Sequence, residues 1–173
     1  MGLPIDVNFK VNDDITRRIQ SEPNVTSDAL GNFVIVWPDE RDSVYNLFAQ
    51  RFDVNGTPIG RNFRINRNPL SGIDYFYGFA FDAKRNSVVV WSDSGIHILA
   101  QRYDSLGNSV GTNFLISDDT TRAMKSSPVV VARNEGEFFM LWCDARLHHL
   151  DSFNLFGQVY RNWNPIGSNF RVD

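Results

Sequence analysis

The residues best suited to chemistry belong to a phrase that occurs three times, in which an apolar run ends in Trp-x-Asp. In the first and third copies an arginine follows two positions after the aspartate, and in the middle copy Gly95 takes its place. A carboxylate and a guanidinium at strand ends could line one face of a ring and bind a polar ligand or a carboxylate. The candidate ligand-binding residues of this phrase are therefore Asp39, Arg41, Asp93, Asp144 and Arg146.

A structural role competes with ligand binding for the same phrase. The aspartate could accept backbone N–H bonds at the strand exit while the arginine holds it in place. Structural ion pairs are the first explanation to weigh for such a set. Because the phrase is present in every unit, and a catalytic site is not copied once per unit, its repetition favours the structural role.

An aromatic cluster, Tyr75-Phe76-Tyr77, lies in the connection that leads into the second unit. Such a cluster could form a platform for stacking a sugar or binding a partner, and it could also pack between units. Tyr75 and Tyr77 therefore join the candidate ligand-binding residues.

Other polar clusters predict neither catalysis nor a metal site. The acidic pairs Asp13-Asp14 and Asp118-Asp119 could bind Ca²⁺ together with loop carbonyls, but their spacing matches no EF-hand loop, and solvated loop charge is favoured. The adjacent His148 and His149 would point apart on an extended chain. Cys143 has no paired base close in sequence. We expect no catalytic residue, no metal and no cofactor.

Three phrases recur in the same order with a period of roughly 50 residues, close to that of propeller repeats. They are an Asn-Phe phrase, the Trp-x-Asp phrase and a Gln phrase that contains Gln50, Gln101 or Gln158. Each glutamine lies between aromatic residues, and a buried amide must be hydrogen-bonded, so we expect it to bond to the backbone of a neighbouring unit. The aspartate and glycine that follow two of the Gln phrases, at Asp53–Gly56 and Asp104–Gly107, predict tight turns.

Each unit divides into four short runs rich in Val, Ile, Phe and Tyr and bounded by Gly, Asn, Asp and Pro, which predicts strands. The fold class expected is all-β, a β-propeller-like array of three four-stranded blades plus one extra C-terminal strand. The chain is expected to form a single repeat domain over 1–173. Its units cover approximately 3–53, 58–104 and 109–161, and a surplus strand lies at 165–173. Because a propeller closes with four to eight blades, we expect either self-association or neighbouring repeats of a longer chain.

Composition excludes several classes of protein. The 173 residues carry a formal net charge of −3, which argues against binding to nucleic acid, and no apolar run is long enough to insert into a membrane. A single cysteine excludes an intrachain disulfide framework. The start, MGLPIDVNFK, shows no signal segment, so the sequence alone indicates a cytosolic protein or a mature or trimmed form.

The phrases GNFVIVWPDERDSVYNLFAQRFDVNGTPIGRNFRIN and GEFFMLWCDARLHHLDSFNLFGQVYRNWNPIGSNFRVD resemble a repeat of secreted, multi-repeat bacterial proteins. The resemblance covers essentially the whole chain and implies a propeller-like fold and a secreted or cell-surface setting. The chain departs from the repeat at Gly95, and at Arg161, which stands where the other units have Asp53 and Asp104.

The function predicted from these observations is a non-enzymatic, propeller-type repeat module of an exported or surface protein, used for binding a glycan or protein ligand or for self-assembly. The alternative is a carbohydrate-binding lectin or a glycan-active propeller enzyme that uses the carboxylates Asp39, Asp93 and Asp144. A glycosidase needs two carboxylates about 5 to 9.5 Å apart, so the placement of these side chains separates the two hypotheses.

Overall fold

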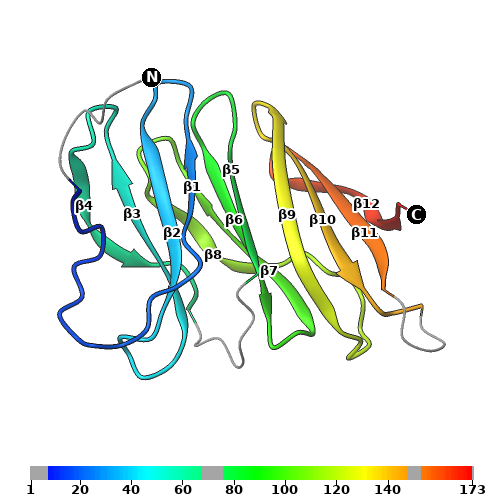
Figure 1. Cartoon of the computed structure of the whole chain (residues 1–173). Helices are drawn as coiled ribbons and strands as arrows, with labels where there is room; N and C mark the ends of the chain where they lie inside the picture. Colours follow the sequence, from blue (N-terminus) through cyan, green and yellow to red (C-terminus); the bar gives the residue numbers. More distant parts are fainter. Residues whose placement is uncertain (1–7, 68–75, 148–152, 173) are drawn as a thin grey trace, which may run out of the picture.

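The computed structural model describes residues 8–67, 76–147 and 153–172, and this part of the chain contains strands and no helix. The strands form three antiparallel four-stranded sheets, each in sequential order (Figure 1). The first sheet contains β1 (Asn24–Ser27), β2 (Phe33–Asp39), β3 (Asn46–Phe52) and β4 (Pro58–Arg64). The second contains β5 (Tyr77–Phe81), β6 (Ser87–Asp93), β7 (His97–Tyr103) and β8 (Ser109–Leu115). The third contains β9 (Lys125–Asn134), β10 (Glu137–Asp144), β11 (Asn154–Arg161) and β12 (Asn164–Arg171).

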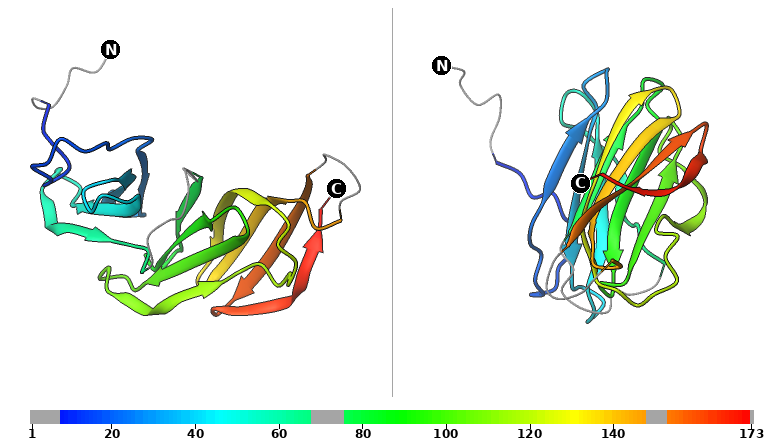
Figure 2. Two further views of the ribbon diagram at one scale, coloured as in Figure 1. Left: turned by 90° about the horizontal axis from the view of Figure 1, so that it is seen from below. Right: turned by 90° about the vertical axis from the view of Figure 1, so that its right-hand side faces the viewer.

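The sheets follow one another along an arc, with the second sheet between the first and the third (Figure 2). The strands that open the sheets, β1, β5 and β9, run next to one another, since both β1 and β9 contact β5. The last strands, β4, β8 and β12, lie on the outer side of the arc (Figures 1 and 2).

The tight turns follow from local chemistry. The Asp53 side chain accepts hydrogen bonds from the N–H groups of Asn55 and Thr57, at 2.9 and 2.8 Å, and Gly56 takes a φ of 80°. Asp104 and Gly107 repeat this arrangement between β7 and β8. An L-residue with a side chain is strained at such a φ, so these turns confirm the prediction made from the Asp and Gly spacing.

The Asn-Phe phrase ends each sheet instead of beginning the next one. Asn62 and Phe63 lie in β4, and Phe170 lies in β12, which pairs with β11. The C-terminal segment is therefore the fourth strand of the third sheet, and the prediction of an extra C-terminal strand at 165–173 is corrected. The spare copy of the phrase is the N-terminal one, at 8–12, which forms no strand. The sequence could not separate the two assignments because the repeat has no fixed starting point.

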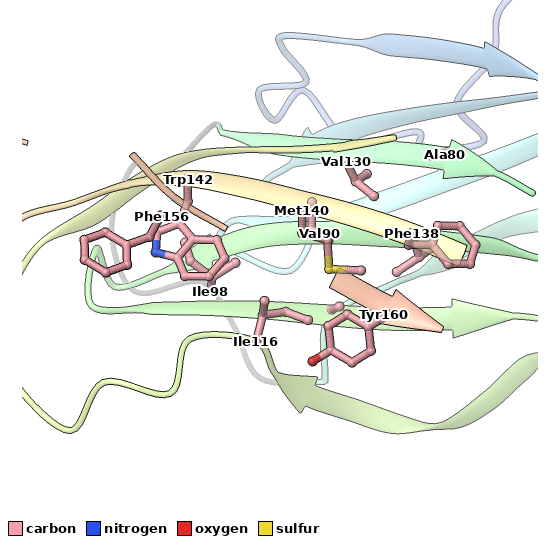
Figure 3. Close-up of a cluster of buried hydrophobic side chains, with 12 residues drawn as sticks. Ala80, Val90, Ile98, Ile116, Val130, Phe138, Met140, Trp142, Phe156 and Tyr160 are labelled. Atoms are coloured by element: carbon pink, nitrogen blue, oxygen red, sulfur yellow. The ribbon is translucent and has the colours of Figure 1, made fainter. Parts of the chain in front are cut away.

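Two apolar clusters hold the sheets together. Between the first and second sheets, Val34, Val36 and Ala49 pack against Val89 and Trp91. The cluster between the second and third sheets is drawn in Figure 3, and it contains Ala80, Val88, Val90, Ile98, Ala100, Ile116, Val130, Phe138, Met140, Trp142, Phe156 and Tyr160. The second sheet thus presents Val89 and Trp91 to the first sheet and the alternate residues Val88 and Val90 to the third, as period-2 strands require.

The repeated glutamines fill a bulge in their own sheets. The pairing of β3 with β4 shifts between Ala49 and Arg51, so Gln50 has no register partner in β4, although it still pairs with Ile35 in β2. The Gln50 amide donates instead to the carbonyls of Arg51 and Ile59, at 2.8 and 3.3 Å. Gln101 and Gln158 repeat this pattern at the same shift. The glutamine is structural, as predicted. Its backbone partners, however, belong to its own sheet, which corrects the expectation that they would belong to a neighbouring unit.

The asparagine of the Asn-Phe phrase makes a hydrogen-bonded contact between units that repeats in all three sheets. Asn113 donates to the Gln101 side chain at 2.7 Å and to the carbonyl of Ile65, in the segment that arrives from the first sheet, at 3.2 Å. Its own side-chain oxygen accepts the N–H of Arg67 at 2.7 Å. Asn169 repeats these contacts with the segment that leaves the second sheet, and Asn62 repeats them with residues 11–13.

Candidate functional site

In the first and third sheets the Trp-x-Asp-x-Arg phrase forms a closed hydrogen-bonded cluster. Asp39 is fully buried, and its side chain accepts the Trp37 indole N–H at 2.8 Å, the Arg41 backbone N–H at 2.8 Å and the Arg41 guanidinium at 2.7 Å. Arg41 also pairs with Asp13 at 2.7 Å and lies over the Phe48 ring, 4.1 Å from its centroid.

The third sheet repeats the cluster with Trp142, Asp144 and Arg146. Asp144 is fully buried and accepts the Trp142 indole and the Arg146 guanidinium at 2.9 and 2.7 Å. Arg146 pairs with Asp118 at 2.8 Å and lies 4.3 Å from the centroid of the Phe156 ring. Because these oxygens are covered and already bonded, Asp39 and Asp144 cannot reach a ligand unless the cluster opens.

The cluster keeps its charges. Burial would raise the pKa of Asp39, but the hydrogen bonds from Arg41 and Trp37 outweigh it and hold the pKa below its usual value. Burial would lower the pKa of Arg41, and the bonds to Asp39 and Asp13 raise it instead. Asp39 and Arg41 are therefore both charged at neutral pH, and their ion pair stabilises the strand ends.

The second sheet differs from the other two. Asp93 is only half-buried, and in the part of the chain that the structure describes it forms no ion pair. The Ser94 hydroxyl donates to its carboxylate in a long hydrogen bond of 3.4 Å. Of the three repeated carboxylates, Asp93 is therefore the one that remains accessible.

The acidic pairs are ion-paired or hydrogen-bonded and are not simply solvated charge. Asp13 and Asp118 each accept a guanidinium, as described above. Asp119 accepts the Lys125 ammonium at 2.8 Å and the Thr121 hydroxyl at 2.6 Å, and the Lys125 side chain is fully buried. Asp14 accepts the Gln20 amide at the equivalent place. No group of three or more His, Cys, Asp or Glu that could hold a metal ion occurs within 8–67, 76–147 and 153–172.

The Lys125–Asp119 pair predicts a loss of stability in acid. Burial would raise the pKa of Asp119, but hydrogen bonds from Lys125 and Thr121 lower it from 3.8 to about 2. A carboxyl whose folded-state pKa is depressed stabilises the protein fully above its unfolded-state pKa, and the contribution is lost as the pH falls from about 4 toward 2. We expect the Tm to fall over this range. In Lys125→Gln, which copies Gln20, the Tm should depend less on pH, and an unchanged pH dependence would contradict this assignment.

A pocket of about 340 Å³ lies where the three sheets come together at their inner strands. It is lined by Glu22 and Asn24 beside β1, by Phe76 and Tyr77 at the start of β5, and by Ser127 in β9. These positions are at the same end of the sheets as the Trp-x-Asp phrases, because β1, β5 and β9 pair antiparallel with the strands that carry them. Phe76 is half-exposed there, at 51%.

Backbone geometry marks the same pocket. Glu22 and Ser127 have φ values of 43° and 52°, a left-handed conformation that is uncommon for residues other than glycine and asparagine. Strained backbone of this kind persists where the surroundings enforce it and clusters at functional sites. The Tyr77 hydroxyl, with one proton to donate, lies within hydrogen-bond distance of the carbonyls of Glu22 and of Val36, the latter at 2.9 Å, and so ties β5 to the first sheet. Burial raises the pKa of Tyr77, which keeps the hydroxyl a neutral donor.

The pocket brings together one predicted site residue and several that sequence reasoning missed. Tyr77 lines it, whereas Tyr75 lies outside the described residues, as do His148 and His149. Glu22 and Ser127 hold equivalent positions, each directly before a proline, but their residue types differ, so the repeat did not single them out. The signal available in the sequence was the exposed aromatic cluster around Phe76.

The fold can be compared with solved structures. An endo-arabinase from Bacteroides thetaiotaomicron superposes with a TM-score of 0.53 at 16% identity over 87% of this chain, and a GH43 endo-arabinanase from Bacillus licheniformis with a TM-score of 0.51 at 14% identity over 89%. The fold is that of a β-propeller. This confirms the predicted all-β, propeller-like fold class with three four-stranded blades, and each sheet is one blade. The chain spans 59% of the length of each of these two chains.

The comparison also corrects the predicted function. A non-enzymatic module used for binding or self-assembly, and the absence of enzymatic activity, were expected from the sequence. Both expectations are contradicted, because the solved structures that share the propeller fold are an endo-arabinase and a GH43 endo-arabinanase. Repetition of the Trp-x-Asp phrase misled the prediction, since a structural role for repeated residues says nothing about a site formed by unrepeated ones.

Neither a family model nor a curated protein matches the chain. No helix in the described part of the chain could cross a membrane.

Proposed function

We propose that this chain belongs to a glycan-active propeller of the glycoside hydrolase type and contacts a polysaccharide at the pocket between β1, β5 and β9. The observation that carries the proposal is the meeting of a carboxylate, an exposed ring and a hydroxyl, from Glu22, Phe76 and Ser127, at the point where all three blades converge. Ligand pockets combine apolar walls with a few convergent polar groups, as this one does. The two endo-arabinanases that share the fold support an arabinan as the first polysaccharide to test.

Each residue has a defined task in this proposal. The Phe76 ring offers an apolar face on which a sugar ring can stack. The carboxylate of Glu22 and the hydroxyl of Ser127 hydrogen-bond to sugar hydroxyls. Hydrolysis requires a second carboxylate within about 10 Å of the first. Glu22 is the one carboxylate among the described residues that line the pocket, so its partner must come from outside this lining.

Binding of oligosaccharides tests the proposal directly. We expect an arabinan-derived oligosaccharide to shift the amide NMR signals around Glu22, Phe76 and Ser127. Phe76→Ala should weaken binding about tenfold, since a stacked ring contributes roughly 1 to 1.5 kcal/mol, and Glu22→Gln should abolish release of reducing ends wherever hydrolysis occurs. Exposed Phe9 is the matched control, and Phe9→Ala should leave binding unchanged. A folded protein whose pocket signals respond to no oligosaccharide would refute the proposal.

We also propose that the protein is exported, on the strength of the resemblance to repeats of secreted bacterial proteins. An acidic propeller without an intrachain disulfide framework is compatible with that setting. Fractionation of the native host with an antibody against this chain tests it, and recovery in the cytosol alone would refute it.

We also propose that the protein self-associates. The outer face of the third blade, which is the face turned away from the second blade, carries apolar side chains at positions that are buried in the other two blades. Leu155 is 41% and Val172 49% exposed, whereas the equivalent residues are only 0 to 4% exposed: Leu47, Ile98, Ile65 and Ile116. A further blade would cover them. Sedimentation velocity over a concentration series should show association, which Leu155→Lys should reduce, and a monomer at every concentration would refute it.

A further inference from the structure

A second pocket, of about 240 Å³, lies on the second blade beside the accessible carboxylate Asp93. It is separate from the pocket between the inner strands and shares no lining residue with it. The lining residues that matter are Arg67, Asp93, Leu99 and Asn113.

The equivalent space in the first blade is filled by an arginine. The Arg41 guanidinium bonds to Asp39 and Asp13, reaches the Asn62 side-chain oxygen at 3.3 Å and covers the Phe48 ring. The third blade is the same, with Arg146 in contact with Asp144, Asp118, Asn169 and Phe156.

Every partner of that arginine has its counterpart in the lining of the pocket. Asp93 corresponds to Asp39 and Leu99 to Phe48, because they hold the same register positions in their sheets. Asn113 corresponds to Asn62, and Arg67 to Asp13, because the backbone N–H of each donates to that asparagine at 2.7 Å. The pocket is therefore the space that an arginine occupies in the other two blades.

The missing arginine has a local cause. The loop between the Trp and Gln strands is shortest in the second blade, and a tight turn closes it through a hydrogen bond of 3.1 Å from the Ile96 N–H to the Asp93 carbonyl. Ser94 and Gly95 take φ values of 56° and 64° in this turn. Gly95 suits that conformation, and it has no side chain to return to Asp93.

Two further differences decide what the pocket can bind. A guanidinium gains from the face of an aromatic ring, and the second blade has Leu99 where the others have phenylalanine. A guanidinium also gains from a second carboxylate, and here Arg67 replaces Asp13 and Asp118 and would repel a cation. The space has lost its arginine together with the features that favour a cation, while Asp93 and the Asn113 oxygen remain as acceptors.

We propose that this pocket binds one neutral sugar ring. Hydroxyl groups of the ring donate to Asp93 and to the Asn113 oxygen and accept from the Arg67 guanidinium, while Leu99 and Trp91 contact its apolar face. The site is local to the second blade, and only the choice of a sugar over another neutral polyol rests on the proposed glycan function.

NMR titration with L-arabinose, glycerol and guanidinium chloride, each alone, tests the proposal. In the native chain we expect saturable shifts at Asp93, Leu99 and Thr112 with L-arabinose, weaker shifts with glycerol and none with guanidinium. Arg67→Asp restores the two-carboxylate pattern of the other blades at an exposed position. In this variant the affinity for L-arabinose should fall at least tenfold and a response to guanidinium should arise. Asp93→Asn should weaken the response of the native chain to L-arabinose, and it should also weaken the response of the Arg67→Asp variant to guanidinium.

The controls separate this site from the central pocket. Glu22→Gln should leave the L-arabinose response at Leu99 unchanged, because Glu22 does not line this pocket. A response at Leu99 without one at Phe76 would sustain this inference and count against the proposed function. A response at Phe76 without one at Leu99 would support the proposed function and overturn this inference. A native chain that responds to guanidinium more strongly than to L-arabinose, or to neither, would overturn the inference.

Discussion

Replacing Asp144 by alanine is expected to lower the free energy of unfolding by about 3 to 5 kcal/mol, the cost of removing one partner of a buried ion pair. The substitution leaves the Arg146 guanidinium, whose side chain is 12% exposed, without its buried carboxylate. It also leaves the indole N–H of Trp142 without its acceptor. Asp118 still pairs with Arg146, but it is 42% exposed and compensates for little of the loss.

The second blade supplies a matched control at the equivalent position. Asp93→Ala removes a carboxylate that is half-buried and bonds only weakly to Ser94, so we expect a cost below about 1 kcal/mol. Asp39→Ala should resemble Asp144→Ala because its contacts are the same. Urea denaturation of the three variants measures the differences. Equal costs at all three positions would show that the Trp-x-Asp-x-Arg cluster does not stabilise the strand ends as its geometry indicates.

The sequence predicted the architecture because repetition reports it directly. An apolar run that ends in Trp-x-Asp and a glutamine that fills a bulge recur once per blade, an Asp-to-Gly turn recurs in two blades, and each recurrence constrains the others. The boundary of the unit was harder to predict, since the Asn-Phe phrase can end one blade or begin the next without changing the period. Only the pairing of β12 with β11 decides between these assignments.

The candidate sites were less predictable for a physical reason. Repetition selects residues that support every blade, such as Asp39 and Asp144, and these residues become buried. The accessible groups lie where residue types differ between units, at the equivalent positions Glu22 and Ser127, each directly before a proline, and at Gly95 beside Asp93. A departure from a repeat can be seen in a sequence, but its consequence cannot. A pocket forms only when the neighbours of the lost side chain hold their positions, and that depends on packing between blades.

A second large loss of stability is expected where side chains of one blade are buried against the next blade. Ile98 is fully buried in the cluster between the second and third blades, and Ile98→Ala is expected to cost about 2 to 5 kcal/mol through lost burial and the cavity left behind. Leu155 holds the same register position in the third blade but is 41% exposed, so Leu155→Ala should cost less than about 1 kcal/mol in dilute protein.

The losses in free energy of unfolding caused by Ile98→Ala and by Leu155→Ala can be compared. Their difference measures how far the outer face of the third blade is covered. If that face packs against a blade of a second molecule, the free-energy cost of Leu155→Ala must grow with protein concentration, since binding stabilises the folded state by mass action. The cost of Ile98→Ala is set within one chain and should not change. Urea denaturation at low and high protein concentration therefore separates a free face from a covered one. A Leu155→Ala cost that matches that of Ile98→Ala even in dilute solution would contradict the exposed placement of Leu155.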